Sequence, residues 1–287
     1  MLTTTGLVAE GGGMRGAYTA GVLEAFLDYN ITFPYAIGVS AGANTLCSYL
    51  SHQKLRNKRL YTKWITDKRF ISVRNFLTEG SYFGMNFLFN ELPEALDPFD
   101  FEAFRASHTT FKVGVTNCKT GRCEYLEPIK SRSLQESDRI LQASSSLPFI
   151  AKIVTINETP YLDGGLSDAI PIKKAIADGY ERNVVILTRN ADYRKTYSKK
   201  TQFITRQGYK QYPHLVHTVG ARYQCYNETL DFIEALEKEG KVFVLRPIKP
   251  LTVDRYEKDS KKLNALYEQG YEQVMQNLAP LKSFIAN

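Results

Sequence analysis

The sequence predicts an α/β fold, a three-layer α/β/α arrangement around a mainly parallel sheet, because a strand followed by a helix occurs twice near its beginning. Residues 7–9 are apolar and precede a glycine-rich loop, after which residues 17–29 carry small and apolar side chains at helical spacing. Residues 35–39 form a second apolar run, which a turn of small residues joins to a helical pattern at 43–50. Strand–helix repeats of this kind favour parallel strands with right-handed crossovers and helices on both sheet faces.

The length and composition indicate one globular domain with an internal insertion. The chain has 287 residues, of which 43% are hydrophobic and 23% are charged, and no linker, repeat or low-complexity tract divides it. No leader pattern precedes the first strand, so no secretory signal is expected, and no apolar run is long enough to span a bilayer. The formal net charge of +7 suits an anionic surface, lipid or nucleic acid, without identifying either.

The cysteines indicate free thiols, because they are too sparse for a disulfide framework and lack the CxxC spacing of zinc sites. They are Cys47, Cys118, Cys123 and Cys225. Free thiols fit a reducing compartment, so we expect a cytoplasmic protein. The basic charge leaves open a peripheral contact with an anionic membrane at its inner face.

A glycine-rich loop follows the first strand and consists of Gly11, Gly12, Gly13, Met14, Arg15 and Gly16. Its spacing matches the dinucleotide-binding fingerprint. That site also needs a carboxylate at the end of the second strand, where this chain has Val39 and Ser40, so a nucleotide-binding enzyme is the lesser alternative. We favour an oxyanion hole, in which successive unhindered N–H groups converge on one developing negative charge.

A G-x-S-x-G pattern joins the second strand to its helix, with glycine at Gly38 and Gly42 around Ser40. This is the nucleophile-elbow pattern, in which a serine occupies a strained strand-to-helix turn. A Cβ atom at either flanking position would collide with the neighbouring strand or helix, which explains the glycines. The serine oxygen is then held near a helix N-terminus, where backbone N–H groups favour negative charge.

Residues 54–108 are expected to form a helical, aromatic-rich insertion near this turn. The segment 51–70 is rich in Lys and Arg, which indicates either a helix with a solvated cationic face or an edge that meets anionic head groups. Residues 76–104 are dense in aromatic side chains and interrupted by Gly and Pro, which predicts short helices. These helices either line an acyl pocket or form an ordinary packed insertion.

The rest of the chain alternates expected strands and helices. Strands are predicted at residues 109–115, 123–126, 152–156, 160–162, 184–188 and 241–245, and helices at 134–144, 171–178, 215–238 and 259–278. Ser133 and Glu136 form a capping box at the start of one helix. Asp163 ends an apolar run and precedes Gly164 and Gly165, a pattern that alone fits a surface turn.

Four blocks of this sequence together resemble the patatin-like phospholipases. They are the glycine loop at 11–16, the serine turn at 38–42, the small-residue run at 143–148 that ends in proline, and the Asp-Gly-Gly motif at 163–165. The resemblance covers roughly residues 7–188. It implies a patatin-like catalytic domain at 1–190, with a helical and strand extension at 191–287 packed on the same domain.

The resemblance implies a lipid acyl hydrolase, similar to phospholipase A or lysophospholipase, that uses a Ser–Asp dyad. Ser40 would be the nucleophile that forms the acyl intermediate, and Asp163 would take and return the proton. The N–H groups around Gly12, Gly13 and Met14 would hold the oxyanion. Arg15 is expected to turn away and anchor the loop. The family needs no calcium, and no cofactor, metal or nucleic-acid partner is expected beside the lipid or lysolipid substrate.

Two other functions stay open at this stage. An α/β-hydrolase-type esterase with a Ser-Asp-His triad would use His214 or His217, which follow Asp163 in the required order, although that fold places more strands before its serine. His52 and His108 fit surface or helix-end positions. A non-catalytic membrane-surface scaffold is the other alternative, and the intact motifs argue against it.

Overall fold

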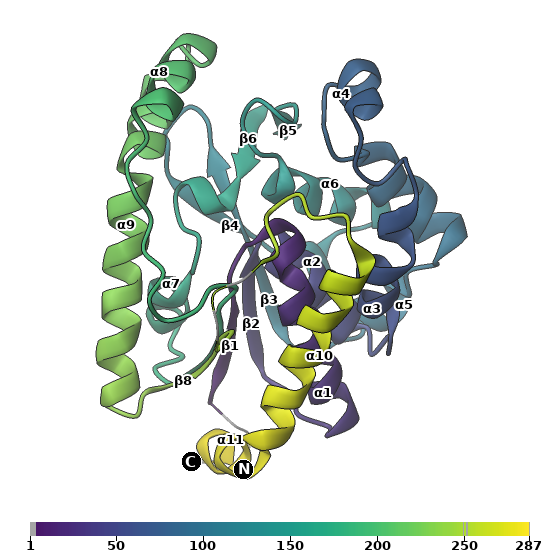
Figure 1. Cartoon of the computed structure of the whole chain (residues 1–287), viewed down its shortest axis with the longest axis vertical. Coiled ribbons are helices and arrows are strands. Elements are labelled where there is room, and N and C mark those ends of the chain that lie inside the picture. Colours follow the sequence, from purple (N-terminus) through teal and green to yellow (C-terminus); the bar gives the residue numbers. More distant parts are fainter. Residues whose placement is uncertain (1–3, 249, 251, 287) are drawn as a thin grey trace.

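The computed structural model of the chain describes residues 4–248, 250 and 252–286. Its centre is a sheet with the strand order β5-β6-β3-β2-β1-β7-β8, and β4 pairs with β3 (Figure 1). The strands are β1 Gly6–Ala9, β2 Tyr35–Val39, β3 Thr110–Asn117, β4 Cys123–Leu126, β5 Val154–Ile156, β6 Thr159–Asp163, β7 Asn183–Ile186 and β8 Val242–Leu245. The pairs from β3 through β2, β1 and β7 to β8 are parallel, and the pairs β3–β4, β3–β6 and β5–β6 are antiparallel.

Helices cover both faces of this sheet. They are α1 Gly16–Asp28, α2 Ala41–Leu50, α3 Arg56–Thr62, α4 Val73–Glu79, α5 Phe101–Arg105, α6 Leu134–Ser145, α7 Ile172–Ala177, α8 Lys199–Gly208, α9 Pro213–Lys238, α10 Ser260–Gln276 and α11 Leu278–Ala286. Shorter turns are η1 Gly13–Arg15, η2 Trp64–Thr66, η4 Pro128–Lys130 and η5 Gly164–Leu166, and η3 Phe87–Leu96 is a π-helix.

The side chains of β1 show how the layers form, because successive residues point to opposite faces. Leu7 and Ala9 join the apolar cluster of α1, α2 and α10, whereas Val8 joins the cluster that α7 and α9 cover. Figure 1 places these two groups of helices on opposite sides of the sheet. The prediction of an α/β fold with a mainly parallel central sheet is therefore confirmed.

Most of the cationic side chains in the segment 51–70 form ion pairs. The segment contains the short helices α3 and η2 rather than one long helix. Lys54 pairs with Asp28 and Lys58 with Glu268, at 2.6 and 2.7 Å. The buried Asp97 receives two more of these cations, which are Arg56 and Arg59. This pairing supports the interpretation as a structural, solvated face.

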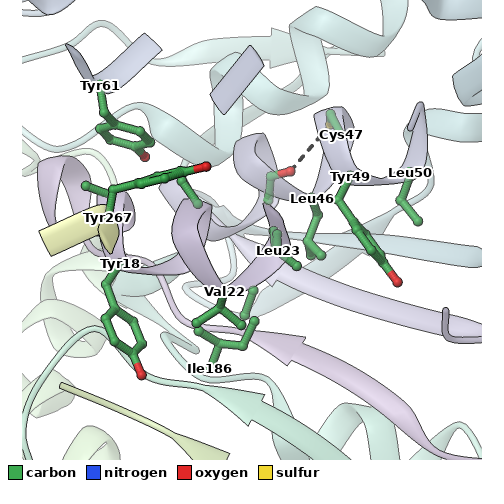
Figure 2. Packing of buried hydrophobic residues seen from close by; sticks show 14 of the residues in the cluster. Tyr18, Val22, Leu23, Leu46, Cys47, Tyr49, Leu50, Tyr61, Ile186 and Tyr267 are labelled. Atoms are coloured by element: carbon green, nitrogen blue, oxygen red, sulfur yellow. Dashed lines mark hydrogen bonds between the residues drawn. The ribbon is translucent and has the colours of Figure 1, made fainter. Parts of the chain in front are cut away.

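The C-terminal part of the chain contributes to the sheet and to one helical layer. Strand β8 pairs with β7, and α10 crosses α1 so closely that a Cβ atom at Gly21 would clash with the carbonyl of Tyr267. Gly270 meets the backbone of Tyr18 in the same way. In Figure 2 the ring of Tyr267 lies between the labelled side chains of Tyr61 and Tyr18. Glycine is needed on both helices because their backbones touch.

Candidate active site

Ser40 lies at the sharp turn between β2 and α2 with φ 54° and ψ −127°. This left-handed conformation is strained for a residue with a side chain, as the elbow pattern requires. A Cβ atom at Gly38 would lie 2.8 Å from the nitrogen of Ala43, and one at Gly42 would lie 2.6 Å from the carbonyl oxygen of Glu10. The sequence therefore needs both glycines for the turn to form.

The small-residue run at 143–148 holds the serine turn in place. The N–H of Ser40 donates to Ser144 Oγ at 2.8 Å, and that hydroxyl donates to the carbonyl of Gly114 in β3 at 2.7 Å. The carbonyl of Ser146 accepts the N–H of Asp163 at 2.8 Å. One segment at the end of α6 thus fixes the backbone of both Ser40 and Asp163, which lie far apart in the sequence.

Asp163 ends β6 with only 2% of its surface exposed, and its carboxylate lies close enough to the Ser40 hydroxyl for that hydroxyl to lower its pKa. The N–H of Gly165 donates to its Oδ1 at 2.7 Å. Burial raises the pKa of Asp163 above the usual range, although the Ser40 hydroxyl and the charge of Arg222 counteract this effect. Gly164 packs against the carbonyl of Gly114, where no side chain fits. A carboxylate of raised pKa is a stronger base than an ordinary one.

The glycine loop lies directly beside the serine, since a Cβ atom at Gly11 would be 3.2 Å from Ser40 Cβ. Two of its N–H groups are engaged within the chain, because Gly11 donates to Ala169 O at 3.3 Å and Met14 to Arg255 O at 3.2 Å. In the part of the chain that the structure describes, the N–H groups of Gly12 and Gly13 have no acceptor.

Arg15 is buried at 6% exposure and lines a cavity together with Ser40, so it does not turn away from the site. Its Nε atom has no hydrogen-bond acceptor. Burial and the neighbouring Arg189 lower the pKa of Arg15 to about 10. The loop continues through Gly16 into α1, and a side chain at Gly16 would collide with Tyr61.

Glu10, whose role the sequence analysis did not predict, directly precedes the glycine loop and fixes its start by two hydrogen bonds. It is buried at the end of β1, where its Oε2 accepts the N–H of Thr188 at 2.6 Å and its Oε1 accepts the Tyr226 hydroxyl at 2.7 Å. The carboxylate therefore ties β1 to the end of β7 and to α9. The only sign of this role in the sequence is that Glu10, a charged residue, stands between the apolar strand and the glycine loop.

Two cavities meet at Ser40, and Gly13 and Leu147 also line both of them. The first is mainly apolar and has a volume of about 160 Å³, close to the ~150 Å³ of an engineered cavity that binds benzene. The insertion supplies much of its wall, with Phe70, Phe83, Met85, Phe89, Leu92 and Phe99. The second cavity is narrow, about 20 Å³, and is lined by the glycine loop, Asp163 and several cationic side chains.

No histidine lines either cavity beside Ser40. His214 and His217 are exposed at the beginning of α9, and His52 and His108 are also exposed. The geometry offers no triad partner for Ser40 and Asp163. Within residues 4–248, 250 and 252–286 no cluster of His, Cys, Asp or Glu has the arrangement of a metal site, and the four cysteines are free.

Comparison with known proteins gives two family matches along the chain. The patatin-like phospholipase family matches residues 7–176, and a domain of unknown function, DUF6363, matches residues 212–286. The uncharacterized protein YjjU of Escherichia coli strain K12 is 29% identical over 253 residues, which cover 85% of this chain and 69% of YjjU. The crystal structure of VipD from Legionella pneumophila aligns with a TM-score of 0.49 at 13% identity, over 98% of this chain and 67% of that one.

Proposed function

We propose, from the premise that this chain belongs to the patatin-like phospholipase family, that it hydrolyses carboxylic esters of lipids with Ser40 as nucleophile and Asp163 as base. One observation carries the proposal. Ser40 occupies the strained turn, lies beside a buried carboxylate, and lines an apolar cavity. A structural turn would need neither the buried partner nor the cavity.

In the acylation step Ser40 Oγ attacks the ester carbonyl carbon while its proton passes to Asp163. The negative charge on the carbonyl oxygen is met by the free N–H groups of Gly12 and Gly13, together with the N–H of Ala41 at the start of α2. Collapse of this intermediate breaks the bond to the alcohol, which leaves with the proton from Asp163. Water, deprotonated by Asp163, then releases the fatty acid by the same route.

The two cavities suit the two halves of the ester. The apolar cavity accepts the acyl chain, since its aromatic and aliphatic wall gains free energy by covering hydrocarbon. The alcohol is left on the side of the narrow cavity, where Asp163 returns the proton. The insertion therefore serves as an acyl-binding wall, although several of its aromatic rings, such as Phe104, are also part of the packed core.

A peripheral contact with an anionic membrane is part of this proposal, and it relies on α4 and α8 rather than on the paired cations at 51–70. These two helices flank the carboxyl ends of the parallel strands (Figure 1). They expose apolar side chains, notably Leu77 at 79% and Phe203 at 65%, and carry Arg74, Lys199 and Arg206. Exposed apolar groups beside cations are typical of surfaces that bind lipid interfaces. In the described residues no helix is both long and apolar enough to cross a bilayer.

The test is labelling by a fluorophosphonate probe, combined with hydrolysis of p-nitrophenyl butyrate. We expect Ser40→Ala to abolish labelling, because the probe reacts with the nucleophile. Asp163→Asn should lower the hydrolysis rate by roughly 10³-fold or more, because the nucleophile then lacks its base. The His214→Ala/His217→Ala variant serves as the matched control and should retain both activities. Full hydrolysis by Ser40→Ala would refute the proposal, and loss of activity in the histidine variant would favour the triad.

A further inference from the structure

The narrow cavity beside Ser40 carries a concentration of positive charge that the proposed mechanism does not use. Its wall includes Arg15, Lys195, Arg222 and Arg255, against one acidic side chain, Asp163. Only Arg15 belongs to the glycine loop. The other three come from the loop before α8, from α9 and from the segment before α10, so the C-terminal part of the chain builds this wall.

These cations are not neutralised by the protein. Arg222 Nε donates to the carbonyl of Gly165 at 2.5 Å, and Lys195 Nζ lies 3.0 Å from the centroid of the Tyr226 ring. Among the described residues, the ammonium of Lys195 and the guanidinium of Arg255 have no hydrogen-bond acceptor and no ion-pair partner. Arg15 is buried and the other three cations are partly buried. Cations that are removed from water normally have such partners, so their grouping around a cavity indicates an anionic ligand.

Burial and the neighbouring positive charges lower the pKa values of two of these cations. Burial and the charge of Arg222 lower the pKa of Lys195 well below the usual range, and burial with Arg255 lowers that of Arg222. Glu10 opposes this effect on Lys195, but its oxygens are already bonded to Thr188 and Tyr226. An anion in the cavity would raise the pKa of Lys195 back toward its usual range, because its charge acts on the ammonium in the opposite sense to that of Arg222.

We propose that this cavity binds the phosphate monoester of the leaving alcohol, so that the enzyme prefers acyl esters of glycerol phosphate to esters of uncharged glycerol. Arginine and lysine side chains match a phosphate by charge-assisted hydrogen bonds. A phosphate monoester carries a charge of about −1.5 to −2 at pH 7, which suits several cations better than a zwitterionic head group does.

This inference rests on the proposed function, because it places the phosphate on the alcohol side of Ser40. The experiment compares kcat/KM for 1-oleoyl-glycerol 3-phosphate and 1-oleoyl-glycerol, which share one acyl chain, in neutral detergent micelles. For the wild type we expect the phosphate-bearing substrate to be preferred by roughly tenfold or more, as a single well-placed charge contact provides. Lys195→Gln and Arg255→Gln should each reduce this ratio several-fold. The exposed Lys238→Gln, at the end of α9, is the matched charge control and should leave the ratio unchanged.

Equal kcat/KM values for the two substrates in the wild type would overturn the inference, as would variants of Lys195 and Arg255 that both keep the full ratio. Inorganic phosphate should inhibit hydrolysis of the phosphate-bearing substrate competitively, and less so in Lys195→Gln. If it instead stimulates hydrolysis of the uncharged ester, the cavity is a site for free phosphate and the inference is wrong. A wild type that neither hydrolyses p-nitrophenyl butyrate nor reacts with the probe would contradict the proposed function itself. A wild type that does both but hydrolyses the two oleoyl esters equally well would contradict only this inference.

Discussion

Asp138 of α6 is a buried carboxyl group in the wall of the apolar cavity, and its Oδ2 atom has no hydrogen-bond partner. Burial raises its pKa from 3.8 to about 7, although the nearby charge of Arg56 counteracts the effect. The folded protein therefore holds this group neutral at pH values where the unfolded chain has already ionised it. Its contribution to stability is present in acid and is lost as the pH rises through about 7.

We predict that Asp138→Asn removes this pH dependence. The wild type should lose free energy of unfolding relative to the variant between about pH 4 and pH 7, by up to ~1.4 kcal/mol for each pH unit. Urea unfolding of both proteins at a series of pH values measures the difference. The exposed Asp192→Asn is the control and should follow the wild type. A difference between Asp138→Asn and the wild type that stays constant with pH would contradict the assignment.

Site residues that obey a local backbone rule were predictable from the sequence. Ser40 is marked by the two glycines that its turn requires, and Asp163 by the glycines after it. The roles of Met14 and Glu10 were not predictable in this way. Their partners, such as Arg255 and Thr188, lie more than a hundred residues away and share no pattern with them.

The helices α4 and α8 yield a prediction at the level of elements, because each exposes an apolar residue beside the site. We expect Leu77→Asp and Phe203→Asp to weaken co-sedimentation with anionic lipid vesicles, each by roughly tenfold, since burial of a large apolar side chain contributes about 1.5–3 kcal/mol. Hydrolysis of p-nitrophenyl butyrate in solution should change little. Met275→Asp is the control, because Met275 is also exposed but lies near the end of α10, away from α4 and α8. Unchanged sedimentation of both variants would exclude these helices as the membrane contact.

Elements with a strong period or a capping pattern were found from the sequence, and those without one were missed. The first two strand–helix units and the hairpin of β3 and β4 lie within a few residues of their predicted positions. The capping box at Ser133 begins α6, where Ser133 Oγ accepts the N–H of Glu136 at 3.2 Å. Helix α8 was missed because its composition is mainly polar and it buries a single residue, Thr205, so that no buried apolar stripe marks it. The range given for the last helix included α10 but not the separate α11.

At the level of the whole molecule, the crossing of α1 and α10 predicts an unusual effect of alanine. An alanine normally stabilises the interior of a helix relative to glycine by about 1 kcal/mol. We expect Gly21→Ala to destabilise this protein instead, by about 1–3 kcal/mol or more, because its Cβ atom would overlap the backbone of α10. Thermal unfolding measures the change. Gly220→Ala in α9 is the matched control, since its Cβ atom would meet only the flexible end of Gln202 and should cost little.

The support of the glycine loop by distant residues also bears on when the protein becomes competent during its synthesis. Met14 is bonded to the carbonyl of Arg255, and α1 rests on α10. A nascent chain that has reached only β7 already contains Ser40 and Asp163, and domains begin to form while translation proceeds. Such a chain still lacks the carbonyl of Arg255, which binds the N–H of Met14, and helix α10, which packs on α1. We therefore expect the growing polypeptide to gain the proposed hydrolytic activity only after the residues up to about 270 have been added.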